Sequence, residues 1–300
     1  MRLNIKRLVL ITVSLSTLLM IACEPANRVL PSIAGFTLEA NQQLKDFLVS
    51  VRNESGRKIA VFDGDGTVLG QTPHYLADEC MYQWAEQHPE ENPQVLDSLK
   101  AQSNVSLPYV QNRIHLIAGM SLLDYRDLGE ACFNTYYQHK IFLPMRDMIE
   151  ILKGENFEIW IVTASPEGMY QQFLSEAFQI PITHIIGVKS VIRNGIITDE
   201  IVHPVPQDHG KKEAIETFVQ DVPLLVAGNS RGDKEMIEYS RGIKMIINPD
   251  EHIAPDQTES IADYAKRNQW LIVQIADIPD PDFPSVSSQK YGIRTNKTHN

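Results

Sequence analysis

Two aspartates spaced two residues apart, Asp63 and Asp65, directly follow the apolar segment Ile59–Phe62. Residues i and i+2 of an extended segment point the same way, so both carboxylates can face one small site. Two carboxylates held this close repel each other and favour a divalent cation with oxygen ligands, such as Mg²⁺. The alternative is a solvated Asp-Gly turn after a core strand. Further polar residues elsewhere in the chain are therefore needed to distinguish a binding site from such a turn.

Three further polar groups follow apolar or helical segments later in the chain. Thr163 ends a buried-strand pattern over residues 159–162, and Lys211 opens a helical pattern that reads Gly-Lys-Lys-Glu-Ala-Ile. Asp233 closes the segment Gly-Asn-Ser-Arg-Gly-Asp, which follows a third strand pattern over residues 224–227. Open α/β sheets bind ligands at the carboxyl ends of their strands, so these groups can converge on one site.

The order Asp-x-Asp, Thr, Lys, Asp resembles the four motifs of the haloacid dehalogenase superfamily over about residues 58–248. The resemblance implies an α/β fold: a Rossmann-like parallel sheet core flanked by helices, with an inserted helical cap domain after the first core strand. The first two motifs lie too far apart for a simple βαβ crossover. Helical patterns fill the interval, at residues 75–88, 95–101, 109–118 and 122–137. This arrangement is similar to the phosphoserine-phosphatase-like branch.

The resemblance implies a role for each matched residue. Asp63 would attack phosphorus and form an aspartyl-phosphate, while Asp65 would protonate the leaving oxygen and later take a proton from water. Thr163 would hydrogen-bond a phosphoryl oxygen, and Lys211 would supply positive charge to the transition state. Lys212 is the alternative lysine, but Lys211 follows a glycine directly. We expect catalysis by Asp63, Asp65, Thr163 and Lys211, and phosphate binding by Gly66, Thr67, Thr163, Ala164, Ser165 and Lys211.

The last motif departs from the pattern of many relatives, which have Gly-Asp-x-x-x-Asp there. This chain has Asn229 in place of the first aspartate and keeps Asp233. An asparagine offers a neutral oxygen but no charge, so metal affinity could be weaker, or the ligand role could shift to Asp233. The expected Mg²⁺ ligands are Asp63, Asp65 through its backbone carbonyl, Asn229 and Asp233.

The expected function is magnesium-dependent hydrolysis of small phosphomonoesters, such as phosphoserine- or phosphocholine-like metabolites, in the periplasm. Within the superfamily that the motifs resemble, dehalogenases lack a carboxylate at the position of Asp65 and transport ATPases carry Thr there. Phosphatases and some phosphomutases keep the aspartate. Two alternatives stay open. One is a phosphotransferase that uses the same intermediate, and the other is a non-catalytic lipoprotein that binds phosphate esters, favoured only by Asn229.

The first 23 residues predict export. A basic start precedes an apolar run over residues 8–21. A membrane span needs about 20 residues, so this shorter run suits a secretory signal. The run ends at Ala22-Cys23, which resembles a bacterial lipobox with Cys23 as the lipidated first residue. The residue after the cysteine is Glu24 and not aspartate, which in Gram-negative lipoproteins would favour the outer membrane. An uncleaved anchor and an ordinary secreted protein are the alternatives.

The net charge limits the classes of molecule that the protein can bind. The net charge of −11 and the lack of a basic stripe disfavour nucleic acid. The same negative charge repels an anionic substrate at long range, so a phosphate must be captured by local groups, namely the metal, Lys211 and backbone amides.

With Cys23 lipidated, Cys80 and Cys132 remain, and both lie in the expected cap. In an oxidising compartment they could form a disulfide; two buried thiols are the alternative.

The chain of 300 residues is 43% hydrophobic, enough for one substantial core and a cap. Its expected organisation has six parts. These are a lipoprotein signal peptide (1–22), a tether (23–38), the first part of the core (39–69), the helical cap (70–143), the second part of the core (144–277) and an extended or disordered tail (278–300).

Overall fold

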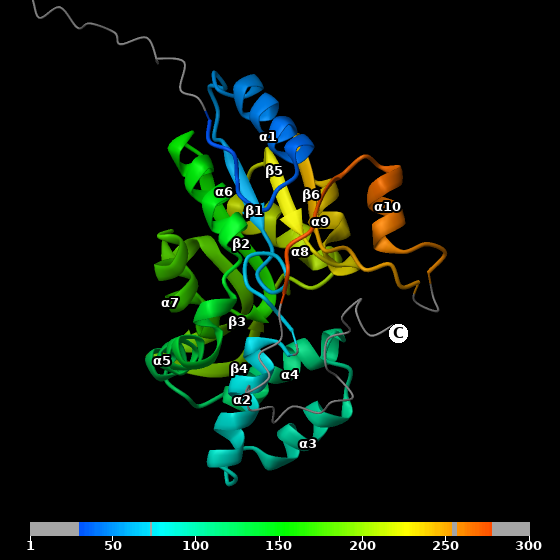
Figure 1. Cartoon of the computed structure of the whole chain (residues 1–300). Helices are drawn as coiled ribbons and strands as arrows, with labels where there is room; N and C mark the ends of the chain where they lie inside the picture. The colour runs from blue at the N-terminus through cyan, green and yellow to red at the C-terminus, as the bar shows by residue number, and fades with distance from the viewer. Residues whose placement is uncertain (1–29, 73, 254–256, 278–300) are drawn as a thin grey trace, which may run out of the picture. The chain divides into compact units, whose positions relative to one another are not determined.

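A seven-stranded sheet with the order β4-β3-β2-β1-β5-β6-β7 lies at the centre of this computed structural model, which describes residues 30–72, 74–253 and 257–277 (Figure 1). Every neighbouring pair of strands is parallel except β3 and β4, which form an antiparallel hairpin at one edge. The predicted α/β class with a mainly parallel sheet is therefore confirmed. The strands are β1 (Ile59–Phe62), β2 (Glu158–Pro166), β3 (Ile185–Arg193), β4 (Ile196–Val202), β5 (Leu225–Gly228), β6 (Ile243–Ile247) and β7 (Leu271–Val273).

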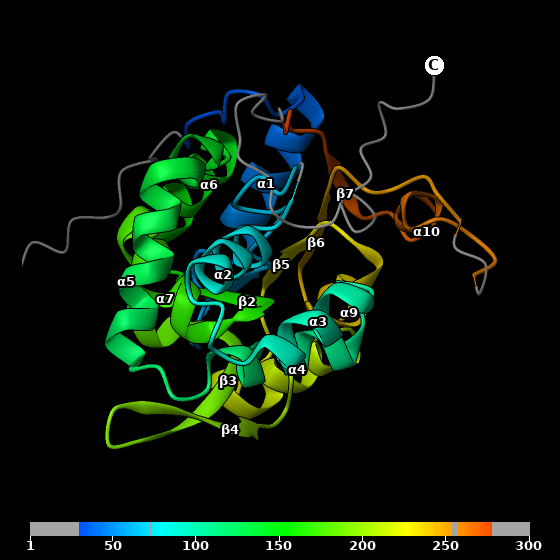
Figure 2. The same cartoon turned by 90° about the horizontal axis from the view of Figure 1, so that it is seen from below.

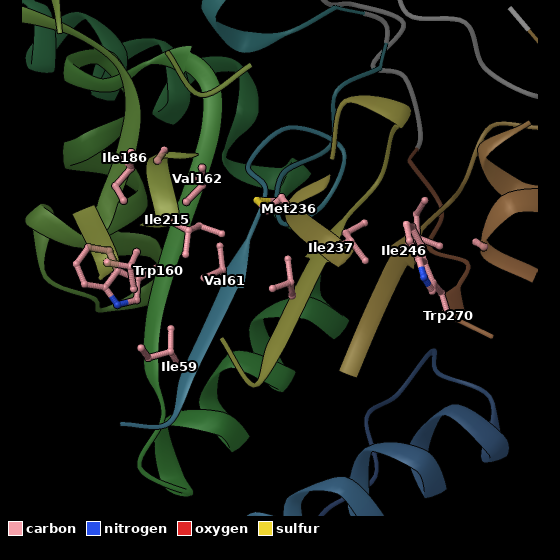
Figure 3. Packing of buried hydrophobic residues seen from close by; sticks show 14 of the residues in the cluster. Ile59, Val61, Trp160, Val162, Ile186, Ile215, Met236, Ile237, Ile246 and Trp270 are labelled. Carbon is pink, nitrogen blue, oxygen red and sulfur yellow. The ribbon is translucent and has the colours of Figure 1, made fainter. Parts of the chain in front are cut away.

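The central strands are continuous apolar runs because helices cover both of their faces. On one face, Ile59 and Val61 of β1 pack with Trp160 and Val162 of β2 in a buried cluster (Figure 3). Side chains from α9 and from the helical turn after α8 complete this cluster. Burying each such aliphatic side chain stabilises the fold by about 1.5–3 kcal/mol.

The register of the sheet sets the position of the motifs. Phe62, the last residue of β1, pairs with Ile161 of β2 and Ala227 of β5. The amide of Asp63 continues this pairing, since it donates to the carbonyl of Ala227 at 2.9 Å. The residues that follow these strands therefore emerge at one edge.

Helices flank the sheet, and their ends follow local capping rules. Thr37 caps α1, accepting a hydrogen bond from the amide of Ala40 at 3.1 Å. Pro144 lies in the first turn of α6, where its missing N–H costs nothing. The helices and helical turns of the core are α1 (Leu38–Ser50), α6 (Leu143–Gly154), α7 (Glu167–Phe178), η3 (Ile182–His184), α8 (His209–Ala214), η4 (Ile215–Val219), η5 (Arg231–Asp233), α9 (Lys234–Glu238) and α10 (Ile261–Arg267).

A helical insertion, residues 76–140, separates β1 from α6. Figure 1 shows α2, α3 and α4 grouped at the end of the sheet opposite α1, and Figure 2 shows the same helices from below. Ser106 and Ser121 cap α4 and α5. The insertion comprises α2 (Leu76–Gln87), α3 (Pro93–Ala101), α4 (Leu107–Ile117), α5 (Leu122–Cys132), η1 (Phe133–Tyr137) and η2 (Gln138–Lys140).

Helix α5 lies directly against α7 of the core. A Cβ atom added to Gly129 of α5 would lie 2.0 Å from the backbone oxygen of Met169, so this close approach requires glycine. A disulfide between Cys80 and Cys132, with Cα atoms 6.1 Å apart, joins α2 to α5. The structure thus contains the pairing that the sequence suggested, and it links α2 to a helix packed on the core.

The structure differs from the expected organisation at two places. Residues 31–37, assigned to the tether, pack against α1: Ile33 is 2% exposed, and its amide donates to Asn41 at 2.7 Å. Strand β7 was not predicted, because three residues are too few to show a pattern. The described residues from Pro31 onward belong to one compact unit, which includes the helical insertion.

The predicted signal peptide, Cys23 and the predicted tail after residue 277 lie outside the described residues. Among the helices that the structure describes, none has the length and apolar character needed to cross a membrane.

Candidate active site

A cavity of about 780 Å³ lies at the carboxyl edge of the sheet, and the sequence motifs converge on it. Asp63 and Asp65 follow β1, Thr163 lies near the end of β2, and Lys211 lies in the first turn of α8; all four line the cavity. Asp233 ends the short turn after β5 and lies behind Lys211. The structure therefore brings the predicted catalytic residues together.

Lys211 holds two carboxylates in place. Its ammonium lies 2.6 Å from Oδ1 of Asp63 and 2.5 Å from Oδ1 of Asp233, and all three side chains are buried. Burial, together with the charge of Asp233, raises the pKa of Asp63 to about 7, against the opposing effect of Lys211. Lys212 instead pairs with Glu216 at 3.4 Å, outside the cavity lining. The preference for Lys211 over Lys212 is therefore consistent with the geometry.

Two hydroxyl groups bind the carboxylate of Asp65. Ser165 Oγ donates to Oδ2 at 2.7 Å, and the Tyr170 hydroxyl donates to Oδ1 at 2.8 Å. Burial raises the pKa of Asp65 in spite of these two donors, which favours the protonated acid. Tyr170 was not a predicted site residue, because an aromatic residue within a helical pattern reads as part of the core.

The phosphate-binding residues predicted from the sequence line the cavity, with one correction. Gly66, Thr163, Ala164, Ser165 and Lys211 are all in its lining. Thr67 is not in that lining: it is fully buried, and its hydroxyl donates to Oδ2 of Asp63 at 3.2 Å. Thr67 therefore supports the aspartate instead of facing a ligand.

The comparisons with known proteins match this geometry. The family model for haloacid dehalogenase-like hydrolases matches residues 60–238, which contain all four motifs. The chain belongs to the haloacid dehalogenase-like hydrolase family. The resemblance inferred from the motif order is thereby confirmed, and the protein is assigned to a family of enzymes.

Solved structures show a similar fold. A conserved protein of unknown function from Anaerococcus prevotii DSM 20548 has 12% sequence identity and a TM-score of 0.59, with 80% of this chain and 95% of that chain covered. A protein of unknown function from Bordetella pertussis Tohama I has 16% identity and a TM-score of 0.53, with 73% and 99% covered. At these identities the likeness concerns the fold alone. Among curated proteins, no match was found.

The oxygen donors of this haloacid dehalogenase-like hydrolase fit Mg²⁺, which prefers carboxylate, carbonyl and amide oxygens. Asn229 lies against the Asp-Gly-Asp-Gly loop: a Cβ atom on Gly66 would fall 2.0 Å from Nδ2 of Asn229. That glycine therefore keeps the amide beside Asp63 and Asp65. Within the described ranges, no cluster of three or more His, Cys, Asp or Glu side chains could hold a metal.

Asp233, one of the expected Mg²⁺ ligands, has protein partners for both of its carboxylate oxygens. Its Oδ1 binds Lys211, and its Oδ2 accepts hydrogen bonds from the amides of Asn229 and Ser230 at 3.0 and 2.9 Å. The Ser230 hydroxyl donates to the same oxygen at 3.0 Å. With both oxygens engaged and the residue fully buried, Asp233 fixes the loop and Lys211. Asn229 of the same motif lines the cavity.

Arg113 of α4 is a buried cation beside the active-site residues. It is 4% exposed and lines the cavity. Its guanidinium donates to Asp78 of α2 at 3.3 Å and to the carbonyl of Ala164 at 2.6 Å. Arg113 therefore links the helical insertion to the end of β2, and its spacing on α4 gave no indication of this contact.

The segment after β7 forms another wall of the cavity. Asp277 accepts hydrogen bonds from the amides of Gln71 and Thr72 at 2.8 and 3.0 Å, and it pairs with Lys140 at 3.0 Å. Residues 70–72 lead into the insertion, and Lys140 ends it. The end of the described core thus binds both connections of the insertion. Asp277 and Lys140, which form one of these contacts, are 137 residues apart in the sequence.

Proposed function

We propose that this hydrolase cleaves small phosphomonoesters through an aspartyl-phosphate on Asp63, with Mg²⁺ as cofactor. The observation that carries the proposal is the paired arrangement of Asp63 and Asp65 in one cavity. Lys211 contacts the first carboxylate, and two hydroxyls hold the second. A nucleophile and a separate acid–base group are the two parts that a double-displacement hydrolysis requires.

In the first half-reaction, a carboxylate oxygen of Asp63 attacks phosphorus. The bond from phosphorus to the ester oxygen breaks, and that oxygen takes the proton of Asp65. In the second half-reaction, water attacks the phosphorus of the aspartyl-phosphate and gives a proton to Asp65, while the carboxylate of Asp63 leaves. The products are an alcohol and inorganic phosphate, and both aspartates regain their starting states.

Lys211 has a defined part in these steps. Burial lowers its pKa, but Asp233 and Asp63 outweigh burial and raise the pKa above its ordinary value, so the ammonium stays charged. That charge offsets the repulsion between Asp63 and an incoming phosphate. Mg²⁺, held by Asp63, the carbonyl of Asp65 and Asn229, would supply the remaining positive charge for the phosphoryl oxygens.

The cavity volume of about 780 Å³ is in the range of small-molecule sites, which supports a metabolite over a macromolecular substrate. Phosphoserine- and phosphocholine-like esters are suitable candidates for a substrate panel. We propose further that the protein acts in the periplasm, attached to the membrane through Cys23. The basic start, the apolar run and the Ala22-Cys23 junction support this location.

The decisive variant is Asp63→Asn, measured by phosphate release from a phosphomonoester panel with Mg²⁺. Removing the nucleophile should abolish turnover, while Asp97→Asn on the exposed face of α3 should leave it unchanged. Asp65→Asn should lower the rate about 10²–10⁴-fold, the usual contribution of general acid–base catalysis. EDTA should stop the reaction, and added Mg²⁺ should restore it.

Rapid-quench labelling identifies the intermediate and separates the alternatives. Radiolabelled phosphate should be found on Asp63 and on no other carboxylate. Full activity of Asp63→Asn would refute the mechanism. A phosphorylated product formed from an added alcohol would instead indicate a phosphotransferase, and binding without turnover would indicate a phosphate-ester-binding protein.

A further inference from the structure

Tyr170 lies where it can control the acid–base residue of the reaction. We propose that it is a positioning residue that holds the carboxyl group of Asp65 toward the leaving oxygen of the substrate, and that helix α2 takes part through the Ala77 amide. The inference rests on the proposed function, because it assigns a task to Asp65.

The contacts of Asp65 come from two different parts of the core. Ser165, near the end of β2, donates to one carboxylate oxygen at 2.7 Å, and Tyr170, in the first turns of α7, donates to the other at 2.8 Å. An aspartate bound through a single oxygen can still turn its carboxyl plane. One bound through both oxygens has a fixed plane, so removing either hydroxyl should release that plane.

Tyr170 is itself held from two sides. Its side chain is fully buried, and its ring lies 5.1 Å from the ring of Phe173 in a tilted arrangement. Its hydroxyl accepts a hydrogen bond from the amide of Ala77 at 3.3 Å. Ala77 lies in the first turn of α2, where helix amides have no partner within the helix. One hydroxyl group therefore connects the helical insertion to Asp65.

The chemistry of the first half-reaction makes this arrangement testable. An alkoxide is a poor leaving group and needs the proton of Asp65 while its bond to phosphorus breaks. A p-nitrophenolate leaves without that proton. A misplaced Asp65 should therefore slow hydrolysis of alkyl phosphates selectively, and a displacement of about 1 Å can lower a rate about 10²-fold.

The test compares kcat/KM for an alkyl phosphate and for p-nitrophenyl phosphate in Tyr170→Phe. We expect a loss of about 10- to 10²-fold with the alkyl ester and less than about threefold with the nitrophenyl ester. Tyr125→Phe is the matched control, because Tyr125 is also fully buried and its hydroxyl reaches Met81 Sδ at 3.7 Å. In that control, kcat/KM should change by the same factor for both substrates.

A double-variant cycle with Ser165→Ala adds a second measurement. If both hydroxyls hold one carboxylate, the losses with the alkyl ester in the double variant should not equal the product of the single losses. Tyr170→Met, which fills similar space without a hydroxyl, serves if Tyr170→Phe does not fold.

An equal loss with both substrates, or independent effects of Tyr170 and Ser165, would overturn the inference. Failure of both Tyr170 variants to fold would assign the residue to stability and overturn it as well. The proposed function fails separately, through an active Asp63→Asn. An inactive Asp63→Asn with an unchanged substrate ratio in Tyr170→Phe would remove only the present inference.

Discussion

At the residue scale, the site depends on one ammonium that is shared by two carboxylates. Lys211 lies between Asp63 and Asp233, and each of these contacts is 2.6 Å or shorter. A buried charge pair of this kind is costly to break, because the remaining partner stays in a medium of low dielectric. The consequence is a division of tasks in the last motif. Asp233 binds the lysine, and we propose the neutral Asn229 as the metal ligand.

That division predicts the effect of restoring a charge. Asn229→Asp should lower the Mg²⁺ concentration for half-maximal activity about tenfold, because adding an anionic ligand raises affinity for a hard cation. The measurement is a Mg²⁺ titration of phosphate release.

Asp233→Asn is the comparison variant. It weakens the contact with Lys211, so we expect lower activity and a lower melting temperature with little change in the Mg²⁺ requirement. If Asp233→Asn raised the Mg²⁺ requirement while Asn229→Asp left it unchanged, the metal assignment would have to be exchanged between the two residues.

At the scale of elements, the helical insertion is held to the core near the active site. Arg113 of α4 reaches the carbonyl of Ala164, the amide of Ala77 in α2 reaches Tyr170, and Asp277 binds the connections of the insertion. The disulfide ties α2 to α5, the helix that packs on α7. These contacts place groups of the insertion beside the residues of the active site.

The disulfide predicts a redox-dependent stability. It closes a loop of 52 residues, so its loss in Cys80→Ser/Cys132→Ser should lower the free energy of unfolding by about 4 kcal/mol on the chain-entropy model. Denaturant unfolding with and without a reductant measures the effect.

Reductant should destabilise the wild-type protein and leave the double variant unchanged. Two freely alkylated thiols in native exported protein would contradict the disulfide in the working enzyme.

At the scale of the whole molecule, the described residues from Pro31 onward form one compact unit. The compact unit holds the complete set of motifs, so a protein that lacks the first 23 residues should retain activity. The amino-terminal part is proposed to determine location only.

The location is tested by Cys23→Ser. We expect this variant to remain an unlipidated precursor, because lipid attaches to the lipobox cysteine and this attachment precedes cleavage of the signal peptide. Fatty-acid labelling in a bacterial host measures it, with Cys80→Ser as a control that should still label. Labelling of Cys23→Ser would show that the lipoprotein assignment is wrong.

The sequence by itself determined the family, the sheet and the residues that meet in the cavity. Asp63, Asp65, Thr163 and Lys211 were predictable because each follows a strand or opens a helix, and the carboxyl ends of parallel strands share one edge. The helical insertion was also predictable, since amphipathic periodicity is a local property.

Only the tertiary structure decided which partners these groups have. Tyr170, Arg113 and Asp277 reach the site through contacts over 51 to 206 residues of sequence, and no local pattern marks them. The contact of Asp233 with Lys211 depends on which oxygens face which donors. Such choices follow from the packing of distant elements in three dimensions, where most buried polar groups are hydrogen-bonded.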